Sequence, residues 1–133
     1  MILPITGVFA AVIGILLLFL SAAVVKFRLK YGMGMGVAKD RDFEAAVRAQ
    51  GNLVEYAPLT LLMLGIAELN GVANGFIYWV GMAFVVGRIL HAWGMYQGRG
   101  GPHKARMVGI LLTWASILVI SALLLLNVFQ VYG

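Results

Sequence analysis

Two otherwise apolar stretches of the sequence contain polar residues at helical spacing. The first stretch holds Arg48, Asn52 and Glu55, at positions i, i+4 and i+7. The second holds Arg88 and His91, at positions i and i+3. Residues at these spacings lie along one face of a helix. Guanidinium groups bind carboxylates, and an amide can donate and accept hydrogen bonds, so the two faces together could bind a small charged ligand.

A purely structural interpretation has Glu55 neutralise Arg88, with Asn52 and His91 as hydrogen-bonding groups between helices. That interpretation needs one ion pair, whereas the two stretches contain two arginines against one carboxylate. Arg106 adds a further cation at the start of the last apolar stretch. Because unpaired charges away from water are costly, the excess of positive charge predicts an anionic partner for this site.

The elements that carry these residues are four apolar stretches. The chain has 133 residues, of which 62% are hydrophobic and 11% charged, and a mean hydropathy of +0.97. Each stretch has roughly the 20 residues that a helix needs to cross a bilayer, and the strand-like alternation of a barrel is absent. The sequence therefore predicts an all-α integral membrane four-helix bundle with up-down topology. It forms a single domain, residues 1–133, with spans at about 3–25, 43–69, 72–97 and 106–130.

The basic residues indicate how the bundle is oriented. The linker after the first span carries Lys26, Arg28, Lys30, Lys39 and Arg41. The linker after the third span carries Arg99, Lys104 and Arg106. The second linker, residues 70–75, has no lysine or arginine. The positive-inside rule places the two basic linkers in the cytoplasm and both termini on the opposite side. We expect a multi-pass protein of a bacterial inner membrane, and the net charge of +5 reflects this topology, not nucleic-acid binding.

Two absences in the composition narrow the chemistry. The chain has no cysteine, so any thiol chemistry must use a thiol that the substrate brings. It has two histidines, His91 and His103, which are too few and too separated for a metal site.

The first span could also be interpreted as a cleaved signal peptide. It lacks a basic start and is longer than a typical signal core, so a retained span is favoured.

The polar pattern resembles a known family. The segment from Arg48 to Pro58 reads Arg-Ala-Gln-Gly-Asn-Leu-Val-Glu-Tyr-Ala-Pro, and it is similar to the second-helix signature of the MAPEG superfamily, the membrane-associated proteins in eicosanoid and glutathione metabolism. The segment Gly87–His91 is similar to the third-helix Arg-x-x-His of that family, and Arg106 resembles the arginine that opens its fourth helix. The resemblance covers essentially the whole chain and implies a homotrimer.

The resemblance also implies a function and a set of roles. It implies a membrane-bound protein, similar to glutathione transferases and peroxidases, that uses glutathione as co-substrate. Arg106 would be catalytic by favouring the thiolate, which then attacks a small apolar second substrate arriving from the membrane lipid. Glutathione would be bound by Arg48, Asn52, Glu55, Tyr56, Arg88, His91, Arg28 and Tyr96, with Glu55 meeting its amino group. The alternative is a non-catalytic scaffold of the same fold that binds lipid.

Two departures from the family pattern affect these roles. Met95 stands where many catalytic members have a tyrosine, and the neighbouring Tyr96 is offset by about 100° around the helix. The irregular linker before the fourth span leaves the register of Arg106 open, so Lys104 or Arg99 is an alternative functional cation.

Overall fold

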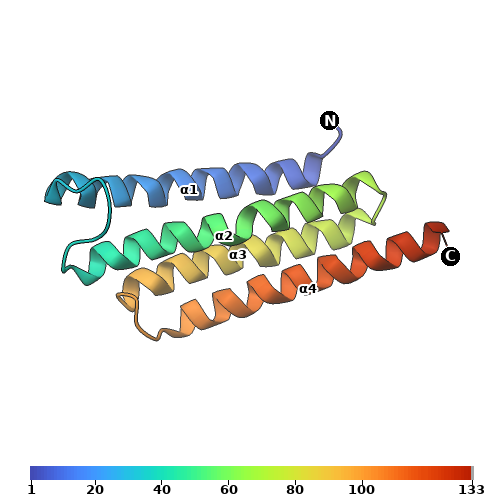
Figure 1. Cartoon of the computed structure of the whole chain (residues 1–133). Coiled ribbons are helices and arrows are strands. Elements are labelled where there is room, and N and C mark those ends of the chain that lie inside the picture. The colour runs from blue at the N-terminus through green and yellow to red at the C-terminus, as the bar shows by residue number, and fades with distance from the viewer. Residues whose placement is uncertain (133) are drawn as a thin grey trace.

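The computed structural model describes residues 1–132, and side chains up to residue 130. It contains four helices, α1 (Pro4–Tyr31), α2 (Arg41–Leu69), α3 (Asn74–Gln97) and α4 (Lys104–Tyr132), and no strand within the described residues (Figure 1). All four are long and apolar enough to cross a membrane. The all-α, four-span prediction is therefore confirmed.

Helix ends differ from the predicted spans by a few residues because capping residues such as Gly32 and Asp40 lie outside the apolar runs. α1 continues past residue 25 to Tyr31 and ends at Gly32, whose φ of 62° suits glycine. α2 begins two residues before the predicted span because the Asp40 side chain accepts hydrogen bonds from the backbone N–H groups of Asp42 and Phe43. The extensions carry charged residues beyond the apolar part of each helix.

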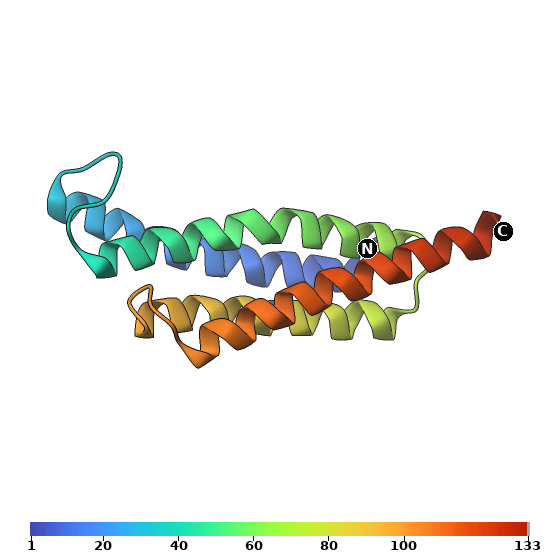
Figure 2. The same ribbon diagram turned by 60° about the horizontal axis from the view of Figure 1, so that its bottom comes forward.

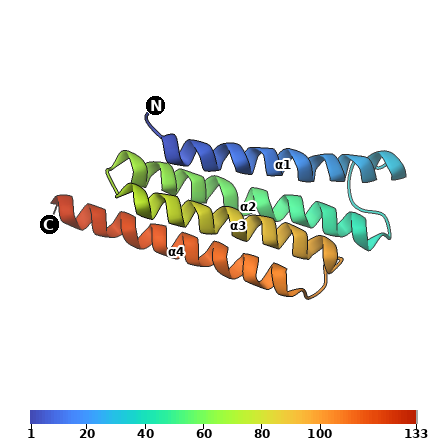
Figure 3. The same ribbon diagram turned by 180° about the vertical axis from the view of Figure 1, so that it is seen from behind.

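The helices are arranged around a central pair. α2 and α3 contact each other, and each also contacts both α1 and α4. α1 and α4 lie on the outside of this pair, in the same order from front and back (Figures 1 and 3). α4 crosses the others obliquely (Figure 2). α1 packs Phe9, Ile13 and Leu20 into the core, so it is an integral helix of the bundle.

The two basic linkers lie at one end of the bundle. The α1–α2 and α3–α4 linkers share that end, whereas the N-terminus, the α2–α3 linker and the end of α4 lie at the other (Figure 1). This is the up-down topology predicted from the sequence. Large apolar side chains such as Phe19, Trp79 and Leu118 are exposed around the bundle, as expected for helices that face lipid.

Glu68 ties the start of α1 to the end of α2. Its two carboxylate oxygens accept hydrogen bonds from the backbone N–H groups of Ile5 and Thr6, at 2.9 and 2.8 Å. These N–H groups belong to the first turn of α1, where no intrahelical acceptor exists. α1 has no side-chain cap of its own at Leu3, so Glu68 supplies one from 62 residues away.

We expect Glu68→Ala to lower the free energy of unfolding by about 2 kcal/mol, because it leaves two partly buried N–H groups without an acceptor. Glu68→Gln retains one acceptor oxygen and should lose about half as much. Thermal unfolding in detergent measures both, with Leu69→Ala at an exposed neighbouring position as control. Equal unfolding temperatures for the Glu68→Ala variant and the parent protein would contradict this role.

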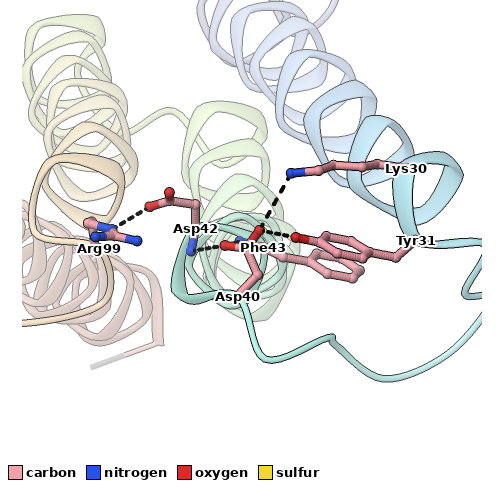
Figure 4. A network of polar contacts seen from close by, with 6 residues as sticks. All are labelled: Lys30, Tyr31, Asp40, Asp42, Phe43 and Arg99. Carbon is pink, nitrogen blue, oxygen red and sulfur yellow. Dashed lines mark hydrogen bonds and ion pairs between the residues drawn. The ribbon is translucent and has the colours of Figure 1, made fainter.

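A polar network organises the linkers at the basic end (Figure 4). The Tyr31 hydroxyl donates to Asp40 Oδ2 at 2.6 Å, and Lys30 lies 4.0 Å from the same oxygen. Arg99 Nε, in the α3–α4 linker, donates to Asp42 Oδ1 at 2.7 Å. The hydrogen bond from Tyr31 lowers the pKa of Asp40 below its usual range, and the two backbone donors act in the same direction.

Tyr31→Phe should raise the pKa of Asp40 towards its ordinary value while keeping the ring stacked on Phe43. A lowered carboxyl pKa stabilises the fold above the unfolded-state value of about 3.9, and this contribution is lost as the pH falls through the folded value. The variant should therefore lose the α2 cap at a higher pH than the parent protein. NMR titration of the Asp40 carboxyl group measures the shift; identical titration curves would show that the Tyr31 hydroxyl has no such effect.

Candidate functional site

A polar cleft with a volume of about 280 Å³ opens at the basic end of the bundle. α2, α3, the α3–α4 linker and α4 all contribute to it. The residues that line it are Arg41, Glu44, Ala45, Arg48, Asn52, Met95, Arg99, Gly100 and Arg106. Four of them are arginines and one is a carboxylate, so the cleft is strongly positive and suits an anionic ligand.

α2 supplies the longest wall of the cleft. Arg41, Glu44, Arg48 and Asn52 recur at intervals of three and four residues, so they form one stripe along the helix. The other face of this segment packs Phe43, Ala46, Ala49 and Leu53 into the core. Burial of that apolar face fixes the rotation of α2 and turns the polar stripe towards the cleft.

Glycines bring α4 against α3 beside the cleft. A Cβ atom at Gly94 would overlap the backbone N of Arg106, and one at Gly109 would overlap backbone atoms of Gly87 and His91. The two helix backbones therefore approach as closely as their glycines allow. This contact sets the position of Arg106. Its Nη1 donates to the carbonyls of Gly100 and Gly101, at 2.9 and 3.3 Å, which leaves the other guanidinium N–H groups for a ligand.

Behind the cleft lies a network centred on Arg88, which is only 2% exposed. Arg88 Nη1 donates to Asn52 Oδ1 at 2.6 Å, and its guanidinium carbon lies 5.2 Å from the centre of the Tyr56 ring. The Tyr56 hydroxyl in turn accepts a hydrogen bond from Trp114 Nε1 at 3.1 Å. The network links α2, α3 and α4 at this level.

The ion pair of Glu55 with Arg88, which the structural interpretation of the sequence required, is absent among the described residues. Glu55 instead lies 3.5 Å from Arg48 Nη1, two turns away on the same helix. Both side chains are 54% exposed, whereas Arg88 is inside the bundle. Glu55 is exposed and Arg88 is buried inside the bundle, so the pair required by the purely structural interpretation does not form.

An apolar groove with a volume of about 680 Å³ runs along the start of α4. Its lining residues are Pro102, His103, Lys104, Arg106, Met107, Val108 and Ile110. Arg106 therefore borders both the polar cleft and the apolar groove, and it is the residue that the two linings share. Lys104 borders the groove alone, and Arg99, which borders the cleft, is already paired with Asp42.

Comparison with known proteins identifies the family of this chain. The model of the MAPEG family matches residues 6–126, which include most of each of the four helices. The chain belongs to the MAPEG family. It is similar to the inner membrane protein YecN of Escherichia coli strain K12, with 26% identity over 115 residues that cover 86% of each chain. YecN of Escherichia coli O6:H1 matches with the same identity and coverage.

The structure brings together part of the site that the sequence of this MAPEG protein predicted. Arg48, Asn52 and Arg106 line one cleft; helical spacing places the first two on one face of α2, and the family resemblance adds Arg106. Glu55 lies beside Arg48 but is not among the cleft-lining residues, and Tyr56 faces Arg88 and α4. The predicted residues on α2 and α4 are thus close together, although they do not share one surface.

Other predicted residues lie away from the cleft of this MAPEG chain. Arg88 and His91 are buried behind it. Arg28 donates to carbonyls of its own linker, at Met33 and Gly36. Tyr96 packs between two apolar clusters of the core and Met95 borders the cleft in its place, as the helical offset predicts.

Sequence reasoning missed Arg41 and Glu44 as members of the MAPEG cleft. Arg41 precedes the predicted second span and counts as a linker cation, and Glu44 lies at the very start of that span. Their spacing is a usable signal, because Arg41 and Glu44 extend the stripe of Arg48 and Asn52 at intervals of three and four residues.

Proposed function

We propose that this MAPEG protein binds glutathione in the polar cleft and directs its thiolate at an apolar electrophile or lipid hydroperoxide held in the groove. The position of Arg106 carries the proposal, because this side chain borders both spaces. A thiolate beside Arg106 would face a polar binding site on one side and an apolar one on the other. That is the arrangement required to join a soluble peptide thiol to a substrate dissolved in the bilayer.

The charges of the cleft support the choice of ligand. Glutathione carries two carboxylates, one amino group and a thiol. The cleft offers Arg41, Arg48 and Arg106, besides Arg99 with its Asp42 partner, and the Glu44 carboxylate. A free thiol has a pKa of about 8.5, and a nearby guanidinium lowers it by favouring the anion. The thiolate is the nucleophile in such reactions, so a chain without cysteine can still perform thiol chemistry.

A second subunit would complete the site. Glu55 lies 14 residues along α2 from Arg41, about 21 Å at 1.5 Å per residue, so the Arg48–Glu55 pair falls well inside the bilayer. Charged groups at such depth are costly when they face lipid. The cleft is also smaller than the roughly 300–1,000 Å³ typical of small-molecule pockets. Both observations support a neighbouring subunit that covers this face of α2, and the family resemblance alone implies that the subunits are three.

The charges of the linkers and the names of the relatives indicate the membrane and the orientation of the chain in it. The basic end of the bundle would face the cytoplasm by the positive-inside rule, so glutathione would enter from that side. The YecN relatives are inner membrane proteins by name, which supports the same membrane for this chain.

Calorimetric titration of glutathione into the purified protein in nanodiscs tests the proposal. We expect saturable binding that weakens by about tenfold or more in Arg48→Ala, which removes a cleft cation, and changes little in Lys26→Ala, which removes an exposed cation elsewhere. Absence of binding at millimolar glutathione would reject the proposal. It would favour the lipid-binding scaffold, for which the apolar groove along α4 is the natural site, and mass spectrometry of lipids retained by the protein would then test that function.

A further inference from the structure

The side-chain amide of Asn52 is held in one orientation by a buried cation. Arg88 Nη1 lies 2.6 Å from Asn52 Oδ1, and a guanidinium can only donate hydrogen bonds. If the amide were flipped, its NH₂ group would face the donors of Arg88, and the hydrogen bond would be replaced by repulsion. The chemistry of the two groups therefore leaves a single stable orientation for the amide.

That orientation determines what Asn52 offers to the cleft. Its oxygen is used by Arg88, so the NH₂ group with its two donors is directed elsewhere, and within residues 1–130 it has no hydrogen-bond partner. Asn52 borders the cleft, whereas Arg88 does not. Towards the ligand the asparagine therefore acts as a donor, although an asparagine can in general act as either donor or acceptor.

The Arg88 side chain lies inside the bundle and does not reach the cleft. It is 2% exposed, its Nε and Nη2 have no hydrogen-bond partner among the described residues, and it forms no ion pair with them. A buried arginine without a carboxylate costs stability, so its presence calls for a role other than stabilisation. Its guanidinium carbon lies 5.2 Å from the centre of the Tyr56 ring, a cation–π contact that helps to hold the group beside Asn52.

We infer that Arg88 is a positioning residue that locks the Asn52 amide, so that the cleft at this depth accepts a carboxylate or carbonyl oxygen and rejects a hydrogen-bond donor. The inference rests on the proposed function in that the cleft holds a ligand, and it deepens that function by assigning a specificity. Near Asn52, the neighbouring Arg48 and Arg106 also donate, so the ligand there must present acceptors. The carboxylate of Glu44, two turns nearer the start of α2, is the place in the same cleft for an amino group.

A double-mutant cycle on glutathione affinity tests the inference. Arg88→Met removes the donor and the unpaired charge while keeping a long apolar side chain, so the variant should fold. We expect it to weaken glutathione binding by about tenfold, because the freed amide can turn its oxygen to the ligand. Arg88→Lys, which keeps a donor, should remain within about threefold of the parent protein.

The decisive comparison repeats the Arg88→Met change in an Asn52→Ala background. If Arg88 acts through the amide, the second change should alter the affinity by less than about twofold. Equal fold losses with and without Asn52 would overturn the inference, since they would show that Arg88 acts on the ligand or on the whole bundle independently of the amide.

A measurement without ligand separates this inference from the proposed function. The side-chain amide ¹⁵N resonance of Asn52 can be identified by its loss in Asn52→Ala. It should shift in Arg88→Met and much less in Arg88→Lys. If glutathione fails to bind the parent protein but these shifts occur, the proposed function is rejected and the lock on the amide stands. An Asn52 resonance that is unchanged in Arg88→Met would overturn the lock whatever glutathione does.

Discussion

Replacement of Arg106 by alanine is expected to reduce glutathione-dependent turnover by about 10²- to 10³-fold, the usual effect of removing one group that stabilises charge at a reacting centre. Arg106 borders both the polar cleft and the apolar groove, so the variant loses the cation beside the proposed thiolate. The pKa of the bound thiol should return towards about 8.5. Turnover in the variant should therefore rise with pH over a range in which the parent protein has already reached its plateau.

The matched variant for Arg106 is Lys104→Ala. Lys104 is a cation two residues earlier on the same helix, and it borders the groove but not the cleft. We expect its loss to change turnover by less than about threefold. Ultraviolet absorbance of the bound thiolate, measured on both variants, distinguishes the two cations. A larger effect of Lys104 than of Arg106 would assign the thiolate to Lys104 and reject the role given to Arg106.

Gly94→Ala is expected to reduce turnover about as much as Arg106→Ala does, although it removes no functional group. A Cβ atom at Gly94 would meet the backbone N and Cα of Arg106, which cannot move aside as the end of a flexible side chain can. The start of α4 must therefore shift away from α3, and Arg106 shifts with it. We expect a loss of about 1–3 kcal/mol in stability, the usual cost of overpacking, together with a severe loss of turnover.

The control for Gly94 lies on the same helix. A Cβ atom at Gly75, in the first turn of α3, would have no atom within 4 Å, so Gly75→Ala should leave both unfolding temperature and turnover close to those of the parent protein. Thermal unfolding and turnover measured on the two variants test the close approach of α3 and α4. A Gly94→Ala protein that keeps full turnover would show that this contact does not position Arg106.

Much of the fold could be predicted from the sequence because it depends on the properties of each segment alone. The length of each apolar run sets the number of spans, and short linkers make successive helices antiparallel. The α2 stripe was predictable for a similar reason, since Arg48 and Asn52 share a face whatever surrounds the helix. The boundaries were less predictable, because caps such as Asp40 and Gly32 lie outside the apolar runs.

Partners between helices could not be predicted in the same way. Pairing Glu55 with Arg88 assumed that the two side chains face each other, and the rotation of α3 against α2 decides this. That rotation depends on contacts of small residues. A Cβ atom at Gly81 would overlap the Phe9 ring, so this glycine decides how closely α1 approaches α3. Gly94 lies seven residues after Gly87, so the two share a face of α3, and a Cβ atom on either would meet backbone atoms of α4.

The carboxylate of Glu68 has a consequence for the order in which the protein is made. The N–H groups of Ile5 and Thr6 find their acceptor 63 and 62 residues later in the chain, at the end of α2. During synthesis the first helix leaves these donors unsatisfied until the second has been made and has crossed the membrane. The α1–α2 hairpin is thus the smallest nascent segment in which the first turn of α1 has its Glu68 acceptor. We expect insertion intermediates that stop before residue 68 to be exposed to quality-control proteases, and those that extend beyond it to be protected.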